Sequence, residues 1–358
     1  MIDFNPLIPT FSRREKALFE FLEVSLKKTM TIAIYDTYCG SHNSGDAIIM
    51  DAVADHLNRL FPYEHKIGYP THYPLSLKAI RKIKKSRISF VGGTNLLSSN
   101  VFLRSKKNQW AVGHIGAFIL KNHSILLGCG WKNYQQQSDI KSRLFYKTIL
   151  SATHLHSVRD SYSEKKMHDF GFMNVVNTGC PTLWKLTPEH CATIPKEKAD
   201  QVVFTLTDYR CHPEADAHMI RLLFSLYGKV YFWIQGAKDL AYLQTLVQNE
   251  ELKKITLIGP SLYEYDQLLL SVDKLDYIGT RLHAGIRAIQ KKRRSIIIGI
   301  DNRAKEISND FNLNVIERGH IAKLSEAIKT PFSTKITLPN ENIAAWKAQF
   351  NSAGTSPL

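Results

Sequence analysis

Short apolar runs alternate with amphipathic stretches along most of this chain, which predicts strands separated by helices. In the first half, the runs that read as strands leading into turns are TIAIYD (31–36), RISFVGG (87–93), SILLGCG (124–130) and HLHSVRD (154–160). Residues 44–60 place Ile49, Val53, Leu57 and Leu60 on one face of a helix. Apolar strands that alternate with helices in this way are typical of a parallel sheet.

The alternation stops at residues 181–200, which hold three prolines and no clear period, and then begins again. The strands predicted beyond this linker are QVVFTLTD (201–208), KVYFWIQG (229–236), ITLIG (255–259), KLDYIGT (274–280) and SIIIGI (295–300). We therefore predict an α/β fold of two Rossmann-like, doubly wound domains that face a cleft, an architecture called GT-B-like. The predicted parts are an N-terminal amphipathic helix (1–30), an N-terminal domain (31–185), a C-terminal domain (195–335) and a C-terminal helix with a tail (336–358).

Residues 11–28 carry Phe11, Leu18, Leu22 and Leu26 at helical spacing among basic side chains. One interpretation is a helix packed on the main body, and the other is an interfacial membrane helix, which three glutamates in the same stretch disfavour. The sequence shows no apolar run long enough to span a bilayer and no signal-peptide pattern. We expect a cytoplasmic protein, either free or associated with the inner face of the cytoplasmic membrane.

Composition narrows the class of partner. Hydrophobic residues make up 44% and charged residues 22% of the 358 positions, as in soluble globular proteins. The five cysteines are scattered, odd in number and free of C-x-x-C pairs, which favours reduced thiols. A net charge of +15 favours anionic partners. Nucleic acid is a poor fit because no nucleic-acid-binding motif is present.

The stretch GSHNSGDA follows the first predicted strand and leads into the first long helix. Gly40 and Gly45 have the spacing of a phosphate-binding loop, but Asp46 and Ala47 occupy the positions of its lysine and hydroxyl. One interpretation is that Asp46 complements the helix dipole beside an Asn43 or Ser44 cap. The other is that this turn faces the neutral hydroxyls of a sugar, where Asp46 binds the acceptor or acts as its base.

Cationic side chains follow several of the other predicted strands. They are Arg159, Arg281 with His283, and Arg303 with Lys305. Ligands of open parallel sheets bind at the carboxyl ends of strands, and a cation in a first helical turn opposes the helix dipole. These residues therefore predict a cleft, built from both domains, that binds an anion. Taken singly, each also has a structural interpretation, such as pairing of Arg159 with Asp160 or packing of His283 in the core.

With these residues identified, the chain resembles the polysaccharide pyruvyltransferase family over roughly residues 31–320. The matching elements are Asn-x-Gly-Asp (43–46), Gly-Gly before Leu-Leu (92–97), Val-Arg-Asp-Ser (158–161), Arg-Leu-His-Ala (281–284) and an apolar strand leading to Lys305. Thr94 stands where family members often have a third glycine.

The resemblance implies a GT-B-like fold and transfer of pyruvate from phosphoenolpyruvate to two hydroxyls of a sugar in a cell-surface or exported polysaccharide, or in its lipid-linked precursor. It implies a cyclic pyruvate ketal and phosphate as products, with no metal and no nucleotide cofactor. The donor-binding residues would be Arg159, Arg281, His283 and Lys305. The acceptor side would comprise Asn43, Gly45, Asp46, Gly93 and Asn95. Arginine and lysine suit a carboxylate and a phosphate, and a histidine is a suitable acid. We hypothesise catalytic roles for His283 as proton donor and for Asp46 as base.

Two alternatives remain at this stage. One is a glycosyltransferase of the same architecture with a nucleotide-sugar donor, for which Glu306 would be the ribose ligand. The other is a non-enzymatic protein that binds anionic glycan or glycolipid. Peripheral membrane contact and a homo-oligomer are compatible with each.

Overall fold

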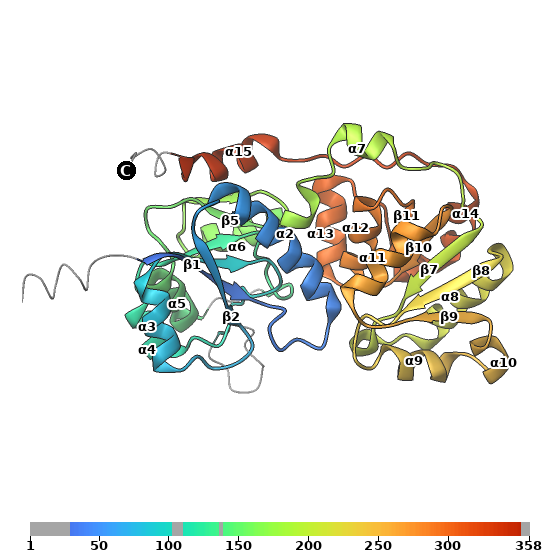
Figure 1. Cartoon of the computed structure of the whole chain (residues 1–358), viewed down its shortest axis with the longest axis horizontal. Helices are drawn as coiled ribbons and strands as arrows, with labels where there is room; N and C mark the ends of the chain where they lie inside the picture. The colour runs from blue at the N-terminus through green and yellow to red at the C-terminus, as the bar shows by residue number, and fades with distance from the viewer. Residues whose placement is uncertain (1–28, 102–109, 136–138, 352–358) are drawn as a thin grey trace, which may run out of the picture.

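The computed structural model describes residues 29–101, 110–135 and 139–351, which form two α/β domains side by side (Figure 1). The predicted helix of residues 1–30 lies outside the described residues, except that Thr29 and Met30 begin the first strand. None of the helices within these three ranges is both long and apolar enough to cross a bilayer.

The N-terminal sheet has the strand order β2–β1–β3–β4, and every pair is parallel. Its strands are β1 (Thr29–Asp36), β2 (His65–Pro70), β3 (Ser86–Gly92) and β4 (Ser124–Leu127). A bridge between Cys129 and Val158 extends it to β5 (His156–Val158), which pairs with β6 (Val175–Asn177). The chain reverses its direction of progress across the sheet between β1 and β3, which is therefore the switch point of this domain.

Alternation along β1 assigns the helices to two layers. Ile32 and Ile34 pack on the side of α2 (Ser44–Leu60), whereas Ala33 and Tyr35 pack on the opposite side. The opposite layer contains α3 (Leu77–Lys85), α4 (Gly113–Ile119) and α5 (Ile140–Ile149), and α6 (Ser161–Asp169) follows β5. Both faces of the sheet are therefore covered, as parallel sheets require.

The C-terminal sheet has the order β12–β11–β10–β7–β8–β9, also with parallel pairs throughout. Its strands are β7 (Gln201–Thr205), β8 (Lys229–Trp233), β9 (Ile255–Ile258), β10 (Leu275–Gly279), β11 (Ser295–Gly299) and β12 (Val315–Glu317). Two half-sheets start from β7 and β10 and wind in opposite directions, so this is the Rossmann order with its switch point between these strands.

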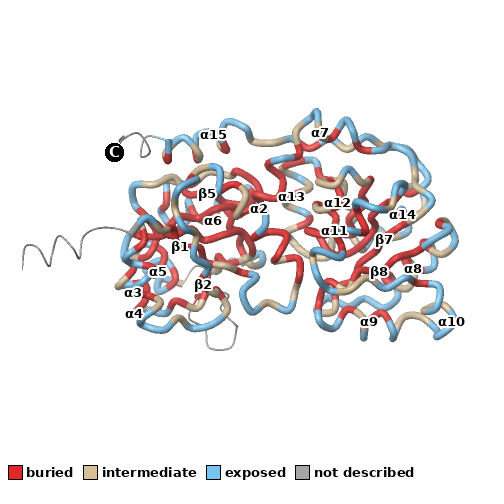
Figure 2. Tube along the Cα trace, in the orientation of Figure 1, coloured by how far each residue is buried: buried red, intermediate tan, exposed pale blue. Residues whose placement is uncertain are grey.

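Helices cover both faces of this second sheet. One layer contains α11 (Leu262–Ser271), α12 (Leu282–Gln290) and α13 (Asn302–Phe311), and the other contains α8 (Pro213–Leu226), α9 (Asp239–Leu246) and α14 (Leu324–Lys329). The short α10 (Asn249–Leu252) precedes β9. The tube in Figure 2 shows a separate buried centre in each domain.

Two segments connect the domains. The proline-rich stretch predicted as a linker forms the short helices η1 (Pro181–Leu183) and α7 (Pro188–Ala192) on its way to β7. After α14 the chain returns to the N-terminal domain, where α15 (Asn340–Ala348) buries Trp346 against Phe90 (Figure 1). The C-terminal helix is therefore part of the N-terminal core.

Three strands have no counterpart in the sequence prediction, namely β2, β6 and β12. All three are edge or outer strands of three to six residues, and β2 reads HKIGYP with mostly accessible side chains. Such a strand is buried on too few positions to give an apolar run.

Candidate active site at the domain interface

The turn after β1 is the first element of the interface between the two switch points. Asn43 caps α2 by accepting a hydrogen bond from the Gly45 amide at 3.1 Å. The same Asn43 Oδ1 accepts from Gln235 Nε2 at 2.7 Å, and the Ser44 amide donates to the Gln235 carbonyl at 3.0 Å. A Cβ on Gly45 would lie 2.5 Å from Gln235 Nε2. The turn predicted to bind the acceptor therefore contacts the loop after β8 directly.

Asp46 lies in the first turn of α2 but does not cap it. Its Oδ2 accepts from Ser41 Oγ at 2.6 Å. Removal from water raises the pKa of Asp46, and the hydrogen bond from Ser41 and the positive charges of Arg303 and Arg281 only partly offset this. Both arginines belong to the C-terminal domain, so the carboxylate faces the cationic half of the interface. A carboxylate with a raised pKa is a stronger base than an ordinary carboxylate.

The Gly-Gly turn after β3 is the second N-terminal contribution. Gly93 has a φ of 57°, and a Cβ there would lie 2.2 Å from Ile49 of α2. Thr94 also has a positive φ, of 54°, at the position where family members often have glycine. These two left-handed residues turn the chain so that Asn95 Oδ1 accepts from Arg159 Nη1 at 2.6 Å.

Arg159 follows β5 and is 1% exposed. Its Nε and Nη2 donate to Asp160 Oδ2 at 3.0 and 2.9 Å, while Asp160 also caps α6. The guanidinium lies directly over Gly130, where a Cβ would be 2.1 Å from Arg159 Cζ. The predicted pairing with Asp160 is therefore present, and it fixes the guanidinium in one orientation.

Arg281 follows β10 and is held in the same manner. Its guanidinium pairs with Asp239, which is 0% exposed, and with Asp208 at 3.0 Å, and its Nε donates to the Leu206 carbonyl at 2.8 Å. A Cβ on Gly236 would lie 2.2 Å from Arg281 Nη2. Nη1 makes no hydrogen bond to the described residues.

His283 is in the first turn of α12 and is 6% exposed. Its Nε2 lies 3.7 Å from Cys180 Sγ. Burial lowers the pKa of His283 to about 3, with the positive charges of Arg303 and Arg159 adding to the effect. The imidazole is therefore neutral near pH 7, and it lies between arginines of the two domains.

Arg303, rather than Lys305, is the cation of the last predicted strand end that reaches this group. Arg303 donates to Asp301 at 2.9 Å and to Tyr209 Oη at 2.8 Å, and its charge acts on both His283 and Asp46. Lys305 is half exposed and lies 3.4 Å from Glu317.

Lys305 instead lines a neighbouring pocket of about 300 Å³ between the domains. This pocket also contains Asp301, Arg318 and Tyr134, and Tyr134 Oη donates to Glu306. Asp301 therefore lines this pocket and also holds Arg303 of the arginine group.

The residues that sequence reasoning did not assign to the site share a simple feature. They all lie in turns just after strands or at the starts of helices: Asp208, Tyr209, Gln235, Asp239 and Asp301. Strand-end position could have identified Asp208, the last residue of a predicted strand, and Asp301, which directly follows one. Asp239 and Gln235 are recognisable only through the contacts they make across the fold.

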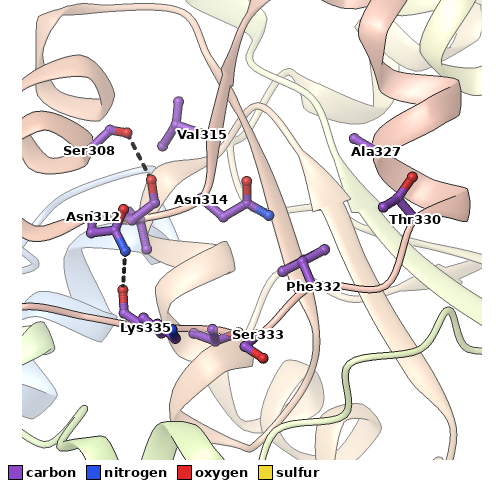
Figure 3. Close-up of a pocket in the computed structure, with 11 residues that line it drawn as sticks. Ser308, Asn312, Asn314, Val315, Ala327, Thr330, Phe332, Ser333 and Lys335 are labelled. Atoms are coloured by element: carbon purple, nitrogen blue, oxygen red, sulfur yellow. Dashed lines mark hydrogen bonds between the residues drawn. The ribbon is translucent and has the colours of Figure 1, made fainter.

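Two other pockets lie away from this interface. They have volumes of about 390 and 440 Å³ and flank residues 333–335. Figure 3 shows the first, where Asn312 Nδ2 donates to the Lys335 carbonyl and Ser308 Oγ donates to the Leu313 carbonyl. It lies at the amino end of β12, opposite to the strand ends that carry the arginines. No group of His, Cys, Asp or Glu within the described ranges is arranged to hold a metal ion.

Two Rossmann-like domains that contact each other at the carboxyl ends of their strands, where three arginines lie, have the GT-B-like architecture. The family model described as "Polysaccharide pyruvyl transferase" matches residues 43–302. The chain belongs to this family of transferases, which attach pyruvyl groups to polysaccharides.

Comparison with solved structures supports the fold. The S. aureus MnaA–UDP co-structure is 11% identical, with a TM-score of 0.51 over 83% of this chain and 87% of that chain. UDP-N-acetylglucosamine 2-epimerase from Rickettsia bellii is 12% identical, with a TM-score of 0.50 over 90% of this chain and 96% of that chain. At these identities the likeness shows shared architecture alone. Comparison with curated protein sequences gives no match.

Proposed function

We propose that this protein transfers the enolpyruvyl group of phosphoenolpyruvate to two hydroxyls of one sugar in a cell-surface or exported polysaccharide or its lipid-linked precursor. The products are a cyclic pyruvate ketal and inorganic phosphate. The observation that carries this proposal is that Arg159 and Arg303 both act on the buried His283, while Arg281 and Arg303 both contact Tyr209.

The three arginines suit the two anionic groups of the donor. Each guanidinium is paired with a carboxylate of its own, so its planar fork is already oriented before a ligand arrives. Within the described part of the chain, each guanidinium also has N–H groups without a hydrogen-bond acceptor, such as Nη1 of Arg281. Because preorganised donors need no rearrangement during the reaction, they can stabilise charge as it develops.

In this proposal, His283 donates the proton that the methylene carbon of phosphoenolpyruvate must accept. Protonation of the methylene carbon of phosphoenolpyruvate gives a methyl group and an oxocarbenium-like carbon, to which the two sugar hydroxyls add in turn as phosphate departs. Of the two hydroxyl protons, one balances the new methyl group and the other leaves with phosphate. The bound donor brings negative charge beside a histidine that is neutral in the free protein, which favours proton uptake.

Asp46 is the proposed base for the acceptor hydroxyls. It belongs to the N-terminal domain and faces the C-terminal arginines, so a sugar between the domains would lie between base and donor. Its raised pKa matches this role better than a role in helix capping, which Asn43 performs.

The test is incubation of the protein with phosphoenolpyruvate and candidate oligosaccharides or lipid-linked sugars. We expect release of phosphate in step with a ketal-linked pyruvate that mass spectrometry detects on the sugar. Release of a nucleoside diphosphate from a nucleotide sugar would instead support a glycosyltransferase. The carboxylate of Glu306, proposed for ribose in that case, already accepts a hydrogen bond from Tyr134. Absence of any heat on titration with phosphoenolpyruvate would favour a glycan-binding protein without catalysis.

A further inference from the structure

The helices α3, α4 and α5 form one outer layer of the N-terminal domain, at the end of the molecule away from the C-terminal domain (Figure 1). α4 packs between the other two: a Cβ on Gly116 would lie 3.2 Å from Ile80 of α3, and the Asn122 amide after α4 donates to the Thr148 carbonyl of α5. The three helices therefore present a continuous surface, which we call the α3–α5 face.

Large apolar side chains are exposed on this face. The residues and their exposed fractions are Leu77 56%, Ile115 71%, Phe118 75%, Ile140 79% and Leu144 66%. At least one comes from each of the three helices, and Ile140 and Leu144 are one turn apart on α5. Single exposed apolar residues are normal, but a group of five on neighbouring helices marks an interaction site.

The charges on the same helices have one sign. α3, α4 and α5 contain eight basic residues and no acidic residue: Lys78, Arg81, Lys82, Lys84, Lys85, Lys141, Arg143 and Lys147. The helices α9, α10 and α11 of the C-terminal domain are the reverse, with Asp239, Glu250, Glu251, Glu264 and Asp266 and no basic residue. An anionic partner is therefore attracted to the α3–α5 face.

We propose that the α3–α5 face docks the protein on an anionic lipid bilayer. Exposed isoleucine, leucine and phenylalanine enter the boundary between headgroups and acyl chains, while the lysines and arginines around them contact the lipid phosphates. Residues 11–28 are a less suitable cover for this face, because their five basic and three acidic residues leave them positive as well. The inference rests on this surface alone and not on the proposed reaction.

The test measures partition of the full-length protein onto vesicles in the absence of substrate. We expect binding to an equal mixture of phosphatidylcholine and phosphatidylglycerol, weakening with added salt, and little binding to phosphatidylcholine alone. The triple variant Lys78→Glu, Arg81→Glu, Lys141→Glu should bind the mixed vesicles at least about 100-fold more weakly, since each basic residue near the surface contributes about a factor of five. The double variant Ile115→Ser, Phe118→Ser should also lose binding.

Matched controls lie on the other domain. Lys254→Glu, Lys274→Glu, Lys329→Glu makes the same change in net charge on exposed positions of the C-terminal domain and should leave binding within about twofold of the wild type. Tyr263→Ser, Leu270→Ser is the apolar counterpart on the acidic α11. Because all of these side chains are exposed, unchanged melting temperatures are expected and would show that each variant is folded.

Three outcomes would overturn the proposal. Equal binding to neutral and mixed vesicles would show that the basic residues do not recognise anionic lipid. If the control triple variant lost as much vesicle binding, binding would depend on the net charge of the protein and not on the α3–α5 face. Binding that is insensitive to both substitutions on the α3–α5 face would show that other residues, such as 1–28, make the contact. Pyruvyl transfer to a soluble oligosaccharide is a separate measurement, so failure of the proposed reaction would be distinguishable from failure of docking.

Discussion

Thr94 has a backbone that its side chain disfavours. A β-branched residue with a φ of 54° is uncommon, and the left-handed region costs such a residue about 1–2 kcal/mol. The strain is retained beside the residues proposed for the reaction, because Gly93 and Thr94 together direct Asn95 to Arg159. The glycine that family members often have at this position would adopt the same turn without strain.

The neighbouring residues Asn43 and Asp46 have different roles, and single substitutions should separate them. Asn43→Ala removes the cap of α2 and the bond from Gln235, so we expect the free energy of unfolding to fall by about 1–2 kcal/mol. Asp46→Asn keeps the shape of the side chain, so we expect turnover to fall by about 100-fold or more without loss of stability. Chemical denaturation and steady-state kinetics measure the two effects.

The pH dependence of stability provides a check on Asp46. Its pKa is raised in the folded protein, so its contribution to stability is present at pH below its unfolded pKa and is lost as pH rises through the folded value. Asp46→Asn should therefore be at least as stable as the wild type at neutral pH, with the difference vanishing in acid. A variant that is clearly less stable at neutral pH would favour the structural role.

His283 should take up a proton when the donor binds. Its pKa of about 3 in the free protein leaves it neutral, and the phosphate and carboxylate of phosphoenolpyruvate would raise that pKa. Calorimetric titration with phosphoenolpyruvate in buffers of different ionisation enthalpy should show proton uptake near pH 7. His283→Gln should bind the donor without this uptake and turn over about 100-fold more slowly. Proton uptake of equal size in His283→Gln would show that a group other than His283 takes up the proton.

The depressed pKa of His283 also predicts an acid response of stability. The unfolded pKa is about 6.5, so the contribution of the neutral imidazole is present above that pH and is lost as pH falls towards 3. The stability of the wild type should therefore fall relative to that of His283→Gln through this range on acidification, which denaturation at a series of pH values measures.

At the scale of elements, burial on both faces of the sheet determines which strands can be recognised from the sequence. The central strands β1, β3, β7, β10 and β11 are buried along most of their length and give apolar runs. β2 at the edge alternates irregularly between exposed and buried positions, and β12 has only three residues. Interior strands could therefore be predicted. Among the edge strands, β9 gives the apolar run ITLI and is predicted, whereas β2, β6 and β12 give no such run and are not.

Gly130, in the loop after β4, leaves the space that the Arg159 guanidinium occupies. Gly130→Ala would put a methyl group where the guanidinium lies, and Arg159 is too enclosed to move without breaking its bonds to Asp160 and Asn95. Loss of such charge-assisted bonds corresponds to about 1.5–3 kcal/mol, so we expect kcat/KM for the donor to fall by about 10- to 100-fold.

Gly228→Ala is the matched control for this change. Its nearest neighbour would be the Asp200 carbonyl at 3.8 Å, an ordinary contact, so kinetics should be unchanged. Equal activity of Gly130→Ala and wild type would mean that Arg159 does not bind the donor.

At the scale of the whole molecule, α13 of the C-terminal domain forms hydrogen bonds with the start of α6 of the N-terminal domain. Asp310 accepts from the Ser161 amide at 2.6 Å, from Ser161 Oγ at 2.8 Å and from Asn177 Nδ2 at 3.0 Å. A carboxylate at the start of α6 also complements its dipole. This contact sets the distance between Arg159, two residues before Ser161, and the C-terminal arginines.

Asp310→Ala should therefore weaken the interface and the site together. We expect a loss of about 1–3 kcal/mol in the free energy of unfolding, because three hydrogen bonds to a carboxylate are lost, and a higher KM for phosphoenolpyruvate. Hydrogen exchange should become faster at the first amides of α6. Asp273→Ala, on an exposed turn of the C-terminal domain, is the control and should change neither quantity. Unchanged kinetics of Asp310→Ala would show that the site does not depend on this contact.

The sequence by itself determined the alternation of strands and helices, the two domains and the strand ends where polar residues gather, because these features follow from local periodicity and chain order. It also singled out Asp46, Arg159, Arg281 and His283, since each follows an interior strand. Only the tertiary structure decided that Arg303 rather than Lys305 joins them, and that Asn43 is the cap. Those outcomes depend on which carboxylate or carbonyl lies opposite each side chain, and such partners, like Asp301 and Gln235, are brought there by packing of two separate sheets.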